Sequence, residues 1–88
     1  MKPSIGRIIH VRINDSTHWP GVPRWRSAVI TAVWGDECVN AVITLDGKND
    51  GDIDLTALGN APREGFQAWI TSTTLGDGVA QWRWPPRV

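Results

Sequence analysis

The chain of 88 residues has no tyrosine, one phenylalanine and one cysteine. A single cysteine excludes an internal disulfide and is typical of a protein from a reducing compartment. The chain also has no net charge, because nine basic side chains balance nine acidic ones. Tight non-specific binding to nucleic acid requires a basic surface, so we expect no nucleic-acid partner. No apolar run reaches the length of a membrane span or a signal peptide, so we expect no membrane contact either.

Tryptophan is the residue in excess, with six copies. Aliphatic side chains fill a core without a polar atom, whereas tryptophan adds a flat π-face and an N–H donor. It is common at interaction hot spots and where rings stack. The chain length predicts one small domain, residues 1–88, that buries only about 60–65% of its unfolded surface. We therefore expect a homo-oligomer, because self-association adds burial.

Alternation of apolar residues with a period of two predicts β-structure through most of the chain. The predicted strands are 4–13, 27–34, 38–45, 66–75 and 79–84. Proline and glycine predict a loop over 14–26, a tight turn at 35–37 and a hairpin turn at 76–78. A second, acidic loop is predicted over 46–65, in which "DLTAL" forms one helical turn or a short strand. The expected fold is all-β, a five-stranded antiparallel SH3-like barrel, or a strongly bent sheet that a second subunit completes.

Two short segments combine tryptophan with arginine, "HWPGVPRWR" at 18–26 and "WRW" at 82–84. If they meet at one end of the barrel, a tryptophan ring can cover a base while an arginine pairs with phosphate. The alternative is that the terminal tryptophans fill the core and the arginine between them is solvated. We expect these residues to line a binding site: Trp19, Arg24, Trp25, Arg26, Trp82, Arg83 and Trp84, with His10 and Asn40 as further candidates.

No group of residues predicts catalysis. The serines lack the G-x-S-x-G context of a nucleophile elbow, and Cys38 begins a strand in apolar company. We therefore expect neither an enzyme nor a cofactor. The acidic sequence "DGKNDGDID" at 46–54 does not fit an EF-hand, because a loop that starts at Asp50 places Leu55 where glycine is required. We expect no metal site and interpret this segment as a solvated loop.

Five segments carry a recognisable pattern: "GRIIHV" at 6–11, "RSAVITAVW" at 26–34, "CVNAVITLDG" at 38–47, "AWITST" at 68–73 and "WRWP" at 82–85. In this order they resemble an abundant group of small, mostly uncharacterised tailed-phage proteins. The chain departs from that group at three positions: Arg83 replaces a histidine, Val11 an aromatic residue and Pro86 an acidic residue. If the group uses that histidine in chemistry, this chain lacks it. The resemblance implies a phage origin, a compact β fold and a location in the host bacterial cytoplasm.

Small phage β proteins of this sort include oligomeric sponges. They sequester nucleotide second messengers of bacterial defence, such as the cyclic ADP-ribose isomers of Thoeris systems or the signals of CBASS. The resemblance therefore implies an anti-defence protein that binds a nucleotide signal without turnover. The alternative is an SH3-like accessory module that docks a host or virion protein through a tryptophan-rich patch.

Overall fold

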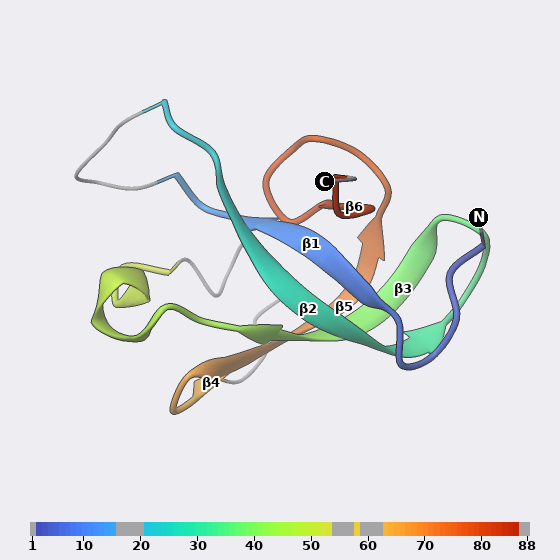
Figure 1. The fold of residues 1–88 in the computed structure, drawn as a ribbon, viewed down its shortest axis with the longest axis horizontal. Coiled ribbons are helices and arrows are strands. Elements are labelled where there is room, and N and C mark those ends of the chain that lie inside the picture. Colours follow the sequence, from blue (N-terminus) through green and yellow to red (C-terminus); the bar gives the residue numbers. More distant parts are fainter. Residues whose placement is uncertain (1, 16–20, 54–57, 59–62, 87–88) are drawn as a thin grey trace.

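The computed structural model describes residues 2–15, 21–53, 58 and 63–86, and within them the fold is all-β, as predicted. A single sheet contains six strands in the order β4-β5-β3-β2-β1-β6, and all neighbouring strands are antiparallel. Figure 1 shows these strands, with the short 3-10 turn η1 at the side. The elements are β1 (Ile8–Ile13), β2 (Arg24–Val33), β3 (Cys38–Thr44), η1 (Gly47–Asp50), β4 (Arg63–Glu64), β5 (Gln67–Thr74) and β6 (Trp82–Arg83).

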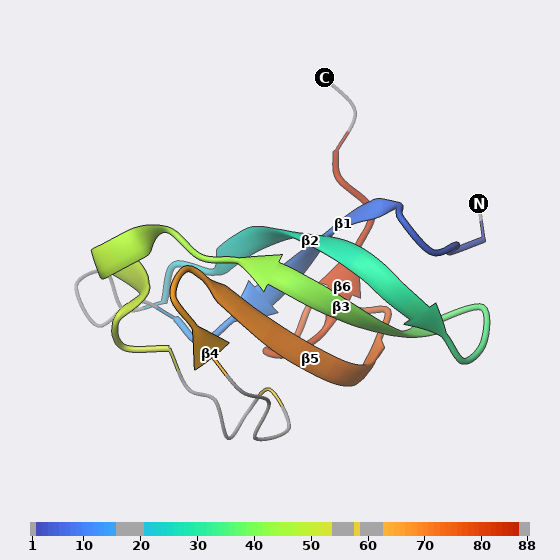
Figure 2. The same cartoon turned by 90° about the horizontal axis from the view of Figure 1, so that it is seen from below.

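The sheet curls into a half-barrel, and β6 brings its two sides together (Figures 1 and 2). On one side β6 pairs with β1, and on the other Trp82 forms a parallel bridge with Leu75, just after β5. The amide of Gly76 donates to the carbonyl of Trp82 over 2.9 Å and strengthens this contact. Register shifts in the β2–β3 and β3–β5 pairs mark bulges, which increase twist and so favour the curl.

The core lies on the inner face of the curled sheet. Alternate residues of the long strands point inward, as the period of two predicted, and exclude water almost completely. The buried apolar residues are Ile9, Val11, Ile13, Ala28, Ile30, Val39, Ala41, Ile43, Leu45, Leu58, Ala68, Ile70 and Trp82. Ile5, which was expected on the same face, is 72% exposed. The backbone turns at Gly6, which has a φ of 91°, so the strand begins only at Ile8.

The C-terminal hairpin predicted from "GDG" and strand 79–84 is wrong. β5 and β6 are not antiparallel neighbours, because the chain between them crosses to pair with β1. Ala80 has a φ of 65°, in the left-handed region that ends regular strand geometry, so the strand is limited to Trp82–Arg83. The side chain of Gln81 supports the connection, since its Oε1 accepts the amide of Gly78 over 2.8 Å.

The N-terminal limit of the second strand was also wrong. β2 begins at Arg24, inside the loop predicted for 14–26, and its first six residues pair with the whole of β1. The "DLTAL" segment at 54–58 lies outside the described residues, except for Leu58, which belongs to the core. Among the described residues, no helix is long and apolar enough to cross a membrane.

Candidate functional site

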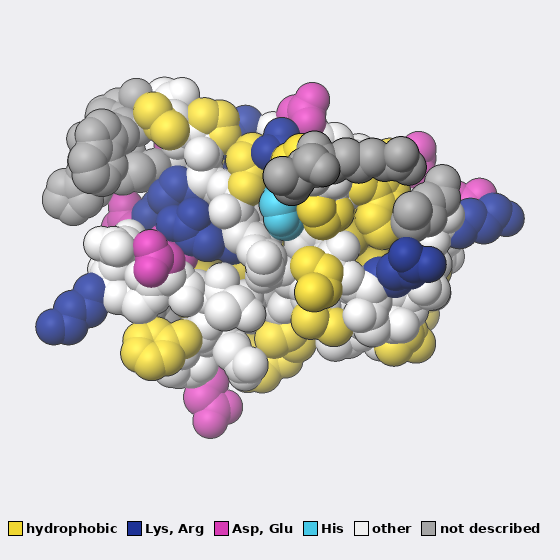
Figure 3. Space-filling model, viewed as in Figure 1, with side chains coloured by type: hydrophobic (Ala, Val, Ile, Leu, Met, Phe, Trp, Pro, Cys, Tyr) yellow, Lys and Arg dark blue, Asp and Glu magenta, His cyan; other side chains and the backbone are white. Residues whose placement is uncertain are grey.

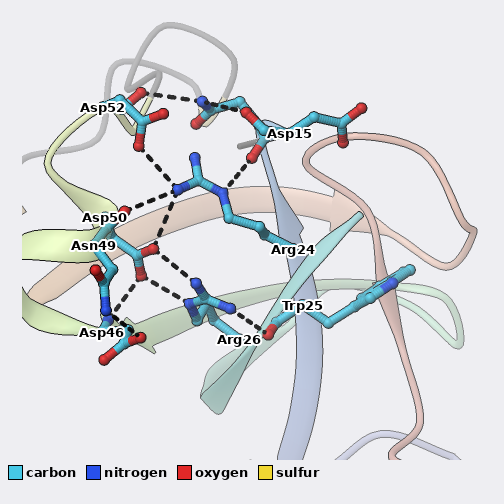
Figure 4. Close-up of polar contacts among 9 residues, drawn as sticks. Asp15, Arg24, Trp25, Arg26, Asp46, Asn49, Asp50 and Asp52 are labelled. Carbon is cyan, nitrogen blue, oxygen red and sulfur yellow. Dashed lines mark hydrogen bonds and ion pairs between the residues drawn. The ribbon is translucent and has the colours of Figure 1, made fainter. Parts of the chain in front are cut away.

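The first three residues of β2 separate two groups that the sequence analysis had joined. Arg24 and Arg26 pair with inward-facing residues of β1, so both guanidinium groups lie on the inner side of the sheet. Trp25 points to the outer side, because adjacent strand residues face opposite ways. Figure 4 shows its ring directed away from both arginines. The "RWR" sequence therefore contributes to two different places on the molecule.

On the inner side, Arg26 forms an ion pair with the carboxylate of Asp50 in η1. Its Nε donates to Oδ2 and its Nη2 to Oδ1, both over 2.8 Å, in a bidentate pair (Figure 4). The amide of Asp46 donates to the same Oδ2 over 2.7 Å. The Asp50 side chain is fully buried, and a buried carboxylate is tolerated only when such partners replace its hydration.

Arg24 completes this network from the same side. Its Nη1 lies 2.9 Å from Asp52 Oδ1 and 3.4 Å from Asp50 Oδ1, and its Nε donates to the carbonyl of Asn14 over 2.8 Å. The interpretation of 46–54 as a solvated loop is thus wrong for Asp50, whose side chain is fully buried. Because carboxylates occupy these guanidinium groups, we assign Arg24 and Arg26 to the fold and leave them out of the candidate site.

The charge state of the network follows from its contacts. Burial raises the pKa of Asp50, but hydrogen bonds from Arg26 and from the Asp46 amide outweigh burial and hold that pKa below its usual value. The hydrogen bonds with Asp50 raise the pKa of Arg26, although its own burial opposes this. The pair therefore stays ionised at neutral pH and fixes η1 against β2.

Trp82 is a core residue, as the alternative interpretation held, and it cannot line an exposed site. Its side chain is fully buried, and its Nε1 donates to the carbonyl of Glu37 over 2.9 Å. Trp84 packs edge-on against it, with ring centroids 5.1 Å apart and an interplanar angle of 88°. Trp84 remains half-buried. The last tryptophans therefore close the half-barrel.

Asn40 holds the backbone of the β3–β5 bulge. Its Oδ1 accepts the amide of Ser72 and the indole Nε1 of Trp34, each over 2.8 Å. Ser72 has a φ of 53°, so the bulge is the strained part of β5. Asn40 thus has a structural role that accounts for its position without a ligand.

Replacing Asn40 with alanine is expected to lower the free energy of unfolding by about 1–2 kcal/mol, because two donors lose their acceptor. Asn40→Asp keeps an oxygen in the same place and is expected to cost less. Urea denaturation followed by circular dichroism measures both changes. Equal losses in the two variants would mean that the acceptor is not what matters at this position.

A cluster of four residues lies on the outer side, where β2, β1 and β6 run next to each other. Arg12 faces Trp25 in one pair of strands, and His10 faces Arg83 in the other. The guanidinium carbon of Arg83 lies 3.9 Å from the centroid of the Trp25 ring, a cation–π contact across β1. Figure 3 views the molecule as in Figure 1 and shows histidine beside hydrophobic and uncharged groups. We name His10, Arg12, Trp25 and Arg83 the outer cluster.

The outer cluster has more positive than negative charge. Arg12 pairs with Asp15 over 2.8 Å, but Arg83 has no carboxylate partner within the described residues. Within that part of the chain, the Nε–H groups of both arginines are buried without a hydrogen-bond acceptor. Burial and the positive charge of Arg83 lower the pKa of His10. The cluster therefore combines an aromatic ring with positive charge, a combination that suits an anion that carries a ring.

The structure brings together only part of the predicted site. Trp25, Arg83 and His10 meet, whereas Trp19 lies outside the described residues. Arg12 was missed, although the period of two that defined strand 4–13 places it on the same face as His10. A charged residue on that face was the signal that could have identified it.

Among the residues that the structure describes, no group of three or more histidine, cysteine, aspartate or glutamate side chains is arranged to hold a metal ion. Comparison of the chain with protein-family models, with curated proteins and with solved structures gave no match.

Proposed function

We propose that the protein binds a nucleotide signal molecule at the outer cluster and sequesters it without turnover. The observation that carries this proposal is the stacked Trp25–Arg83 pair, in which an arginine without a carboxylate partner in the described residues lies on an aromatic ring. The sequence resemblance favours a phage-encoded protein that removes a bacterial defence signal. Sequestration requires affinity alone, so a site built from rings and guanidinium groups is sufficient for it.

The chemistry of the outer cluster matches the parts of a nucleotide. The guanidinium groups of Arg12 and Arg83 suit phosphate oxygens, since charge-assisted hydrogen bonds to phosphate are among the strongest in proteins. A base can stack on a guanidinium group or on an aromatic ring, as bases do in many nucleic-acid-binding sites, and the Arg83–Trp25 pair supplies both. His10 adds a donor whose protonation an anion promotes.

A thermal-shift panel tests the proposal, with cyclic dinucleotides, cyclic ADP-ribose isomers and ADP-ribose as probes. A ligand at about 100 times its dissociation constant adds about 2.7 kcal/mol to the free energy of unfolding. In a domain of this size that corresponds to an increase of roughly 10–20 °C in Tm. The bound probe should be recovered intact after denaturation, and the pKa of His10, measured by NMR, should rise in the complex. A panel without any shift would refute the proposal.

A matched control repeats this panel with two variants, each of which loses one positive charge. Arg83→Gln removes the cation of the outer cluster, and we expect it to abolish the shift. Lys48→Gln removes the same charge from η1, on another part of the chain, and should leave the shift unchanged. Equal loss in both variants would indicate general charge attraction in place of a site.

A protein-docking module is the second candidate, and Trp34 is the observation that favours it. This side chain is 67% exposed, yet its indole N–H is held by Asn40, so a large apolar surface is fixed in water. A host or virion protein captured by the wild type and by Arg83→Gln, but not by Trp34→Ala, would support docking.

A further inference from the structure

A row of apolar side chains crosses the outer face of the sheet. Ile8 of β1 pairs with Val29 of β2, Val29 pairs with Val42 of β3, and Val42 pairs with Trp69 of β5. Directly paired residues in antiparallel strands point to the same side, and, apart from Arg7 before Ile8, the neighbours of these four residues in the chain are core residues. The row therefore faces away from the core. It spans three strand spacings, roughly 14 Å.

This row is unusual for a sheet face in contact with water. The outer side of an antiparallel sheet is normally polar, whereas Ile8 is 56% exposed and Val29 is 43% exposed. Val42 and Trp69 are half-buried. Association with another surface would remove the exposed area of these side chains from water, which is favourable.

The three strands that carry most of the row, β2, β3 and β5, have no charged side chain on the outer face, and charges lie at its edges, on Glu64 of β4 and in the outer cluster. The charged residues of β2, Arg24 and Arg26, point inward, and neither β3 nor β5 contains a charged residue. Apart from Trp25, which belongs to the outer cluster, the outward positions of these strands beside the row hold hydroxyl and amide side chains: Ser27, Thr31, Asn40, Thr44, Gln67 and Thr71. Depletion of charge together with aliphatic and aromatic residues is the composition of an interface centre.

We propose that this uncharged face binds a second copy of the chain around a twofold axis. In such a contact the same patch meets itself, so any cluster of one charge would face a like charge. A contact centred on the outer side of β2, β3 and β5 meets that requirement, whereas a contact centred on the outer cluster of β1 and β6, with its two arginines, does not. The charge pattern therefore favours the same face of a second subunit as the binding partner.

The residues of the row are arranged to be self-complementary. A twofold axis parallel to the strands, lying between the two facing sheets and above the midpoint of Val29 and Val42, places Trp69 over the partner's Ile8 and Val29 over the partner's Val42. The largest side chain of the row then meets the exposed isoleucine at the other end, and the two valines meet each other. Two copies would cover all four residues on each subunit.

Sedimentation of the protein without added nucleotide tests this proposal, so its failure does not affect the proposed function. The wild type should form a dimer in a concentration series. Val29→Asp and Val42→Lys each bury an unpaired charge at the contact and should weaken the dimer at least about 100-fold. Val79→Asp is the matched control, because Val79 is 41% exposed but lies outside the row. It should leave the dimer intact.

Mixing the two row variants gives the decisive measurement. Each variant alone is expected to be monomeric, but together they should form a heterodimer, in which the aspartate of one subunit faces the lysine of the other. Both variants are expected to fold, since Val29 is exposed and Val42 is only half-buried. Circular dichroism checks this. A monomeric wild type, a dimer unaffected by Val29→Asp, or no association on mixing would each overturn the proposal.

Discussion

Replacing Asp50 with asparagine is expected to lower the free energy of unfolding by about 3–5 kcal/mol, the usual cost of removing one partner from a buried ion pair. The carboxylate is fully buried and holds Arg26 in a bidentate contact. Without it, Arg26 loses its counter-charge, and Arg24 keeps only its ion pair with Asp52. Single small domains have only about 5–15 kcal/mol in total, so the variant is expected to be partly unfolded at moderate temperature.

Equilibrium denaturation in urea measures this loss, and Asp36→Asn is the control. Asp36 is also an aspartate in an ion pair, but both members of its contact with Lys2 are exposed and 4.0 Å apart. Exposed pairs contribute about 0–1 kcal/mol, so this variant should match the wild type closely. A similar effect of the two substitutions would show that the buried network does not stabilise the fold.

The same network sets a pH dependence. Because the native pKa of Asp50 is lower than the ordinary value of 3.8, its stabilising contribution is fully present above that value. The contribution is lost as the pH falls through the native pKa. The native pKa of His10 is also lowered, from 6.5, so acidification through that region costs further stability. Asp50→Asn should flatten the stability profile only in the acidic part.

Replacing Trp82 with alanine is expected to cost about 3–5 kcal/mol, as for other large aromatic side chains deleted from a core. Its ring is fully buried, packs against Trp84 and lies at the point where β6 closes the half-barrel. The cavity would open at the least regular part of the sheet. Urea denaturation monitored by circular dichroism measures the loss, and Trp34→Ala, at an exposed ring, is the control.

Trp82→Phe separates packing from hydrogen bonding. Phenylalanine keeps most of the ring but loses the N–H that donates to the carbonyl of Glu37. That carbonyl still accepts the amide of Leu75 over 2.9 Å, so the expected loss is only about 1–2 kcal/mol. If alanine and phenylalanine were equally damaging, the hydrogen bond and not the packing would dominate.

Alternation of side chains made the fold class and most of the core predictable from the sequence. Val11 and Ile43, for example, lie in strands where every second residue is apolar, and both are buried. The pattern was not applied to "RWR", because Pro20 and Pro23 suggested a loop up to residue 26. Once β2 is known to begin at Arg24, the same period separates Trp25 from its two neighbours.

The buried role of Asp50 could not be predicted in the same way. Its partners are 24 and 26 residues away in the chain, and nothing in the acidic sequence around it distinguishes it from the other aspartates. Local composition describes how well a segment is solvated, whereas this carboxylate depends on which strand it meets in space. The contact of Trp25 with Arg83 has the same origin, since β1 lies between them in the sheet.

The two residues of β6 connect the interior of the molecule with its surface. Trp82 faces the core while Arg83, next in the chain, contacts Trp25 on the outside. Local opening of this short strand would expose the core and separate the outer cation–π pair in one event. A ligand bound at the outer cluster must therefore raise the free energy of that opening. Ligand binding and closure of the half-barrel are then thermodynamically coupled.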